Sequence, residues 1–84
     1  MIELRHLQSL HAIHETGSLV EASERLHITQ SALSHQLRDL ESKLDLSLLN
    51  RRARPLRFTT AGLRLLELAD EVLVRDAIRA ADRG

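Results

Sequence analysis

Two stretches of this chain combine arginine with a complete lack of acidic residues, a composition suited to binding phosphate groups. Residues 25–38 contain no Asp or Glu, and neither do residues 46–66, which carry Arg51, Arg52, Arg54, Arg57 and Arg64. The formal net charge of zero therefore hides a segregated charge distribution. A polyanion responds to the local field, because its phosphates gain from nearby Arg and Lys and release condensed counterions. The pattern favours a nucleic-acid-binding surface in spite of the neutral balance.

The other reactive side chains do not form a catalytic or metal-binding set. His11 and His14 are three residues apart, but the chain has no Cys and no third ligand that converges on them, so we expect no metal site. For His6 and His27 we expect roles in packing, turns or a phosphate contact. No Ser/His/Asp arrangement, Gly-rich phosphate loop or carboxylate pair can be placed on one concave wall. The sequence thus predicts no catalytic residue, no cofactor in this chain and no enzyme.

Length and composition fit one small helical domain. The chain has 84 residues, of which 43% are hydrophobic and 29% charged, as in ordinary globular proteins. Leu dominates the apolar residues, with one Phe and no Trp or Tyr, which favours helices over sheet. Without Cys, a long apolar run or a signal-peptide pattern, we expect a cytoplasmic protein with no membrane partner. Because the chain stops within a helical pattern, we also expect a further domain in the complete protein.

Three helices are expected in the first half of the chain. The first carries an apolar stripe at three-residue steps, formed by Leu4, Leu7, Leu10 and Ile13. Gly17 is suited to the left-handed conformation that ends a helix. Ser18 then opens a short second helix, and Glu21 completes a capping box with it.

The third helix, for which Thr29 is the expected N-cap, has two chemically distinct sides. One side is formed by Leu33, Leu37, Leu40 and Leu44, and near the opposite side lie Ser31, Ser34, His35 and Arg38. A helix with a leucine side and an acid-free polar side is suited to contact base edges in a DNA groove.

A hairpin and a long helix are expected to follow. Residues 48–51 and 56–59 form two short segments, with Pro55 at the turn or edge. Thr59 or Thr60 then caps the final helix. The apolar residues of this helix cover too wide an arc for one contact face, so we expect it to pack on its own domain and on a second copy of the chain.

These elements together predict a mainly α fold, a winged helix-turn-helix with three helices, a two-stranded wing and a long C-terminal linker helix. We expect the DNA-binding domain to occupy residues 1–58 and the linker or dimerisation helix residues 59–84. In such a fold the third helix enters the major groove, while the hairpin reaches the backbone or the minor groove.

The stretch Gln30-Ser31-Ala32-Leu33-Ser34-His35-Gln36-Leu37 resembles the LysR-type bacterial transcription regulators. The resemblance covers about residues 1 to 80, and it is supported by Leu4-Arg5-His6-Leu7, Gly17-Ser18, Ala22, Leu26, Leu40-Glu41, Leu48-Leu49, Arg51, Pro55 and Thr59-Thr60-Ala61-Gly62. Within the family, residues 34–36 and 55–59 look most like the regulators of methionine biosynthesis that respond to homocysteine.

The resemblance implies a role for individual side chains. Base reading is expected from Gln30, Ser31, Ser34 and His35, with Gln30 able to form a bidentate pair with adenine. Contacts to the DNA backbone or the minor groove are expected from Ser18, Thr29, Arg38, Arg51, Arg52 and Arg54. Dimerisation is expected through Leu65, Leu66, Ala69, Val72, Leu73, Ala77 and Ala80.

The resemblance also implies partners and a ligand for the full protein. Linker helices of the family pair antiparallel, so a homodimer would bind a partly palindromic site in double-stranded DNA, and the full-length protein would form a tetramer. A small co-inducer, homocysteine in a methionine-type activator, would bind the C-terminal effector domain that this chain does not include. A stand-alone repressor or antitoxin-like DNA binder, and a winged helix that binds proteins, stay open as alternatives.

Three positions depart from the family pattern. Position 35 is often Arg, and the shorter His35 is less suited to bidentate reading of guanine. Asp45 stands where Gly usually turns the chain out of the recognition helix, and Asp adopts the left-handed conformation at some cost. Leu49 replaces the usual Phe and fills less volume under the wing.

Overall fold

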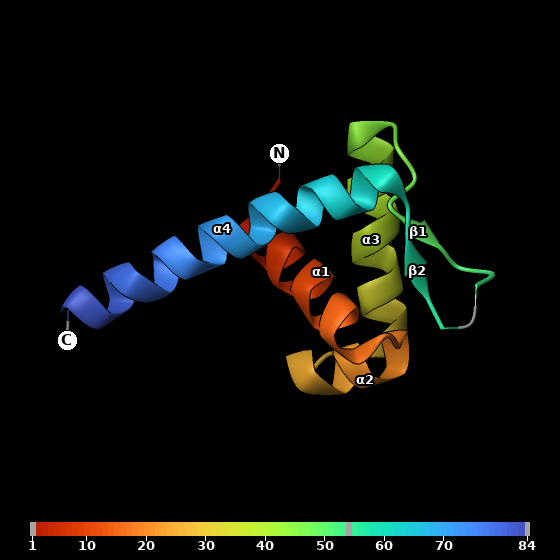
Figure 1. The fold of residues 1–84 in the computed structure, drawn as a ribbon. Helices are drawn as coiled ribbons and strands as arrows, with labels where there is room; N and C mark the ends of the chain where they lie inside the picture. Colours follow the sequence, from red (N-terminus) through yellow and green to blue (C-terminus); the bar gives the residue numbers. More distant parts are fainter. Residues whose placement is uncertain (1, 54, 84) are drawn as a thin grey trace.

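The computed structural model describes residues 2–53 and 55–83. Over these residues the chain forms four helices and one two-stranded sheet, in the order α1 (Leu4–Thr16), α2 (Leu19–Leu26), α3 (Gln30–Leu44), β1 (Leu49–Asn50), β2 (Arg57–Phe58) and α4 (Thr60–Arg83). The predicted mainly α, winged helix-turn-helix architecture is confirmed. Figure 1 shows α1, α2 and α3 grouped together, the hairpin beside α3, and α4 crossing the group before it runs away from it.

The helix ends follow the capping residues in the sequence. Gly17 adopts the left-handed conformation after α1, with φ 68°. Two residues with side chains do the same, because His27 (φ 58°) ends α2 and Asp45 (φ 54°) ends α3. Asp45 thus makes the turn for which Gly is better suited, and α3 ends at Leu44.

The N-caps agree with the sequence pattern except in one detail. Thr29 Oγ1 accepts a hydrogen bond from Ala32 N–H at 3.0 Å, which caps α3. Ser18 Oγ accepts from Glu21 N–H at 3.3 Å, but the Ser18 N–H donates to Thr16 Oγ1 (3.4 Å). The predicted bond from the Ser18 N–H to the Glu21 carboxylate is therefore replaced by a bond to the hydroxyl of Thr16, in the preceding turn.

Leucine side chains from every layer meet in one core. Leu10 and Ile13 of α1, Leu33, Leu37 and Leu40 of α3, and Leu48 before β1 are buried together with Ala22 of α2. Leu19, Leu26 and Leu44 pack against this cluster and are partly buried. The leucine side of α3 therefore faces the core, as predicted, and its polar side is left outside.

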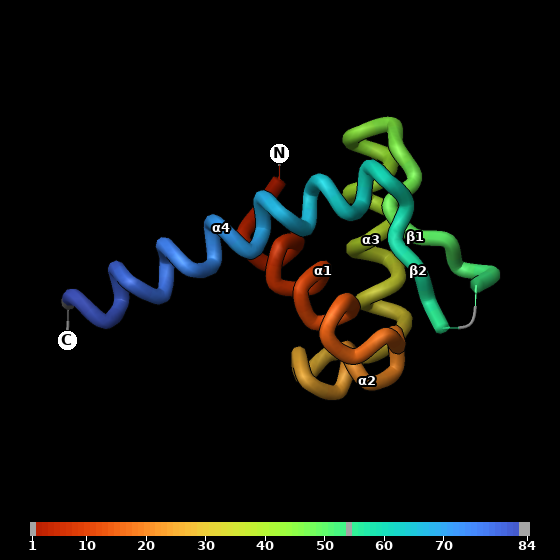
Figure 2. The backbone as a smooth tube through the Cα atoms, viewed as in Figure 1, coloured from red at the N-terminus to blue at the C-terminus, as the bar shows by residue number. Residues whose placement is uncertain are grey.

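The hairpin is shorter than the sequence predicts. Only two residues on each strand pair, with Leu49 opposite Phe58 and Asn50 opposite Arg57. One more backbone bond, from Thr59 N–H to the Leu48 carbonyl (3.0 Å), continues the pairing at the open end. We name residues 49–58 the wing, and Figure 2 shows its described residues, 49–53 and 55–58, projecting beside α3.

Helix α4 begins at the wing and packs on α1 with its first half. Thr59 is the cap, because its Oγ1 accepts a hydrogen bond from Gly62 N–H at 3.0 Å. Leu66 and Ala69 are buried against the domain, whereas residues 74–82 are all exposed. No helix in residues 2–53 and 55–83 is long and apolar enough to cross a membrane.

Candidate nucleic-acid interface

The outer side of α3 presents most of the residues predicted to read bases. Gln30, Ser31 and His35 are exposed, and Ser34 is half-buried. Ser31, Ser34 and His35 lie at helical spacing on the side away from Leu33 and the other core leucines, and Gln30 is the first residue of the helix. Arg38 continues this face one turn further along and is also exposed.

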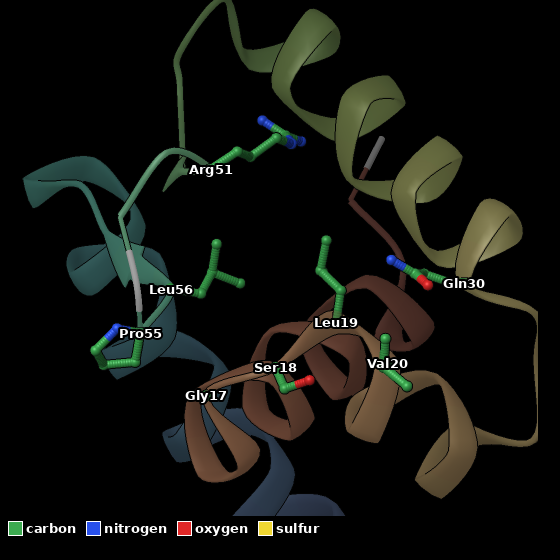
Figure 3. Close-up of a pocket in the computed structure, with 8 residues that line it drawn as sticks. All are labelled: Gly17, Ser18, Leu19, Val20, Gln30, Arg51, Pro55 and Leu56. Carbon is green, nitrogen blue, oxygen red and sulfur yellow. The ribbon is translucent and has the colours of Figure 1, made fainter.

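A hollow of about 280 Å³ separates the start of α3 from the wing (Figure 3). It is lined by Gly17, Ser18, Leu19, Val20, Gln30, Arg51, Pro55 and Leu56. Three residues predicted to contact DNA, Ser18, Gln30 and Arg51, thus surround one space although they come from three elements. The helix-turn-helix and the wing form a continuous concave surface here.

Arg51 has a partner within the domain. Its Nη2 lies 2.7 Å from Glu41 Oε1, and its side chain is only 30% exposed. Arg51, which is predicted to contact the DNA backbone or minor groove, therefore forms an ion pair that joins the wing to α3. The ion pair fixes the position of the guanidinium, and the DNA contact of Arg51 stays a prediction.

Glu41 holds the other end of this connection. Besides the bond from Arg51, its Oε2 accepts from Leu48 N–H at 2.7 Å. Burial raises the pKa of Glu41, but the hydrogen bonds from Arg51 and Leu48 and the charge of Arg51 outweigh it. Since the pKa of Glu41 lies below its ordinary value of 4.5, the side chain is a carboxylate at neutral pH.

The other wing arginines have different surroundings. Arg52 and Arg57 are exposed, and the backbone of Arg52 is fixed by a bond from its N–H to Asn50 Oδ1 at 3.2 Å. Arg54, predicted to contact DNA, lies outside the described residues. Arg38 lines a second, shallow hollow of about 410 Å³ between the end of α3 and the wing base.

The histidines have the structural roles expected for them. The buried His6 accepts a bond from Glu3 N–H through Nδ1 at 3.0 Å, and burial lowers its pKa, which favours the neutral acceptor. His27 forms the turn after α2. His11 lies 2.9 Å from Asp70 Oδ1 and 3.0 Å from Glu15 Oε1, a link from α1 to α4. Among the described residues, no group of His and acidic side chains could hold a metal ion.

The linker helix separates the predicted dimerisation residues into two sets. Leu66 (5% exposed) and Ala69 (0%) belong to the core of the domain, and Leu65 packs partly against it. Contrary to the expectation for them, Leu66 and Ala69 offer no surface to a second copy. Leu73 is half-buried, and the exposed members of the predicted set are Val72, Ala77 and Ala80. Exposed apolar residues absent from the prediction are Leu63, Leu68, Val74 and Ile78.

Three further residues shape the interface without having been predicted. Val20 is 48% exposed beside the hollow, where an apolar residue directly after a capping serine was the available signal. Gln36 accepts from Ser9 Oγ at 2.9 Å, which ties α3 to α1. Glu41 directly follows the core residue Leu40 on α3, and this position was the available signal.

The four-helix arrangement and the hairpin beside α3 define a winged helix-turn-helix domain. The family model described as "Bacterial regulatory helix-turn-helix protein, lysR family" matches residues 4–63, and the chain belongs to this family. The resemblance to LysR-type transcription regulators is thus confirmed, and the curated relatives are regulators rather than enzymes.

Two curated relatives and two solved structures show how far the similarity extends. The chain is 51% identical over 72 residues to the HTH-type transcriptional regulator MetR of Haemophilus influenzae, a match covering 86% of this chain and 23% of the relative. It is 49% identical over 84 residues to MetR of Escherichia coli strain K12, covering 98% and 26%. The chain thus spans about a quarter of the length of these relatives.

Both structures are of DNA complexes. The BenM_DBD/catB site 1 DNA complex has a TM-score of 0.89 and 34% identity, covering 95% of this chain and 86% of the other. The CbnR_DBD–DNA complex has a TM-score of 0.84 and 36% identity, covering 98% and 93%.

Proposed function

We propose that this chain binds double-stranded DNA with α3 in the major groove and the wing at the backbone or minor groove. The observation that carries this proposal is the exposed, acid-free face of α3 beside the arginines of the wing. A helix fits the major groove, and exposed Arg side chains gain from phosphates on either side of it. Two solved structures of similar fold are DNA complexes, which supports DNA binding by this chain.

Individual contacts follow from the side-chain chemistry. Gln30, Ser31, Ser34 and His35 read base edges, and Gln30 has the donor and acceptor for a bidentate pair with adenine. Ser18 and Thr29 accept backbone N–H groups as caps, so each hydroxyl proton is left to donate to a phosphate oxygen. Backbone or minor-groove contacts come from Arg38, Arg51, Arg52 and Arg54, and Arg51 also holds the wing through its ion pair with Glu41.

We further propose that the chain is part of a regulator of methionine biosynthesis genes. The relatives named MetR support this assignment at 51% and 49% identity over the domain. The complete protein would bind a small co-inducer, homocysteine, in an effector domain. Exposed apolar residues on α4 support a homodimer on a partly palindromic site, and the full-length protein would form a tetramer.

Selection of bound sequences from random duplex DNA, followed by affinity measurements on the recovered site, tests the DNA-binding proposal. Gln30→Ala is expected to cost about 1–3 kcal/mol on the selected site and little on random DNA. Arg52→Ala is expected to weaken binding to both and to reduce the salt slope by about one unit. Gln8→Ala, on the exposed side of α1, is the matched control.

Three results would count against the proposal. Equal losses on selected and random DNA for Gln30→Ala would remove its base-reading role. No recovered sequence would refute specific recognition. Binding to duplex DNA that does not weaken with salt would favour a protein-binding winged helix instead.

A further inference from the structure

A single carboxylate joins the recognition helix to the wing. Glu41, in the last turns of α3, has a side chain that is only 12% exposed. One of its oxygens accepts from Leu48 N–H at 2.7 Å, and the other accepts from Arg51 Nη2 at 2.7 Å. Leu48 and Arg51 flank β1, so both ends of this strand are attached to the same point on α3.

The wing has little else of its own to fix its direction. Its sheet consists of two residues on each strand, and a two-stranded hairpin of this size is at best marginally stable alone. Charge-assisted hydrogen bonds with low solvent exposure are stronger and more directional than bonds between neutral groups. Apolar contacts of Leu49, Leu56 and Phe58 hold the wing to the core. Among the polar contacts, the orientation of the wing relative to α3 depends on Glu41 more than on strand pairing.

We infer that Glu41 is a positioning residue for DNA recognition, which sets the direction and separation of the wing relative to α3. Through its bonds to Leu48 and Arg51, α3 and the wing reach adjacent grooves of one duplex at a fixed spacing. Glu41 itself does not touch DNA. The inference rests on the proposed placement of α3 and the wing on the duplex.

Distance measurements on the free protein test the positioning directly. The chain has no Cys, so nitroxide labels can be attached specifically at Ala32→Cys on α3 and Arg57→Cys on β2, both exposed. Electron spin resonance should give one narrow label-to-label distance for the otherwise unchanged chain and a broad distribution with Glu41→Gln. Asp39→Asn is the matched control, since it removes an α3 carboxylate that pairs only along the helix, with Lys43 at 3.1 Å. A distribution unchanged by Glu41→Gln would overturn the inference.

Base-pair substitutions then separate the two grooves. Inosine–cytosine and guanine–cytosine pairs present the same major groove, and only guanine adds an amino group in the minor groove. At pairs flanking the selected half-site, the unchanged chain should prefer inosine–cytosine by about fivefold or more. Glu41→Gln should abolish this preference and keep the discrimination against major-groove changes that α3 reads. Arg51→Met should do the same, and the double variant should lose no more than either single one.

The outcomes separate failure of the positioning role of Glu41 from failure of the proposed DNA binding. A parallel loss of minor-groove and major-groove discrimination with Glu41→Gln would show a general stabilising role and overturn the inference. A minor-groove preference that survives Glu41→Gln would overturn it as well. If the unchanged chain shows no preference at any flanking pair, the wing does not read the minor groove, and the inference of two adjacent grooves is overturned. The proposed DNA binding is tested separately, by the selected sequence and the salt slope.

Discussion

Replacing Gly62 by Ala tests how closely α4 approaches the strand that begins the wing. A Cβ atom at this position would lie 2.1 Å from the Leu48 carbonyl oxygen, and 3.1 Å from both the Leu48 carbonyl carbon and Phe58 Cδ2. The strand would have to retreat by about 1 Å to restore even a tight contact. That movement would strain the bond from Thr59 N–H to the Leu48 oxygen, now 3.0 Å long.

Whether Gly62→Ala stabilises or destabilises the domain depends on the gain in helix propensity and on the loss from overpacking and a strained hydrogen bond. Ala is favoured over Gly within a helix by at most about 1 kcal/mol. Overpacking costs about 1–3 kcal/mol, with the upper end expected against backbone atoms, and loss of the Thr59 bond adds about 1 kcal/mol. We therefore expect Gly62→Ala to destabilise the domain by about 2–3 kcal/mol, which lowers Tm by roughly 8–24 °C for a domain of this size.

Thermal unfolding followed by circular dichroism measures this change, and Gly17 provides the contrast. A Cβ at Gly17 would meet nothing within 4 Å, but φ is +68°, so the cost there is conformational. Asn tolerates this conformation, so Gly17→Asn should be milder than Gly17→Ala, whereas Gly62→Asn should be worse than Gly62→Ala. A Gly62→Ala variant as stable as the parent would refute the steric reasoning.

Three further predictions concern a cap, the linker helix and the response to acid. Thr29→Ala should cost about 1 kcal/mol in chemical denaturation, because the bond to Ala32 N–H is lost; no change would deny the cap. Ile78→Glu, at a residue 63% exposed, should leave monomer stability unchanged but weaken self-association about tenfold or more in sedimentation experiments; unchanged association would place the interface elsewhere. The lowered pKa of Glu41 contributes stability that is complete above its unfolded value near 4.5 and is lost as pH falls through the folded value. The stability of Glu41→Gln should therefore fall less on acidification than that of the unchanged chain. An identical dependence of stability on pH in the two proteins would contradict the lowered pKa.

Local patterns were sufficient to predict the elements and the exposed polar face of α3. The capping residues Ser18 and Thr29 and the leucine repeat of α3 act over one or two turns, so their consequences can be read from neighbouring positions. The left-handed turn at Asp45 likewise follows from its place after the last core leucine. The orientation of the polar side of α3 needed no information from distant residues.

The parts that could not be predicted depend on packing between elements. The pairing of Glu41 with Arg51 joins positions ten residues apart through a turn whose path is not determined by hydrophobic periodicity. Similarly, the sequence shows that α4 has a wide apolar arc, but only its crossing with α1 determines that Leu66 and Ala69 are covered and Ile78 is not. The strands are shorter than predicted because the chain already turns after Asn50, whose carbonyl oxygen accepts a hydrogen bond from Ala53 N–H at 3.3 Å.

The outer half of α4 has a consequence for how folding depends on concentration. Its 24 residues extend for about 36 Å, yet the domain supports only the first half (Figure 1). A helical segment of about three turns without tertiary support is marginal in water, because nucleation is costly and few bonds repay it. Amide hydrogens in residues 74–82 should therefore exchange rapidly in dilute samples and slow down as the protein concentration rises, which makes the order of this segment a gauge of assembly.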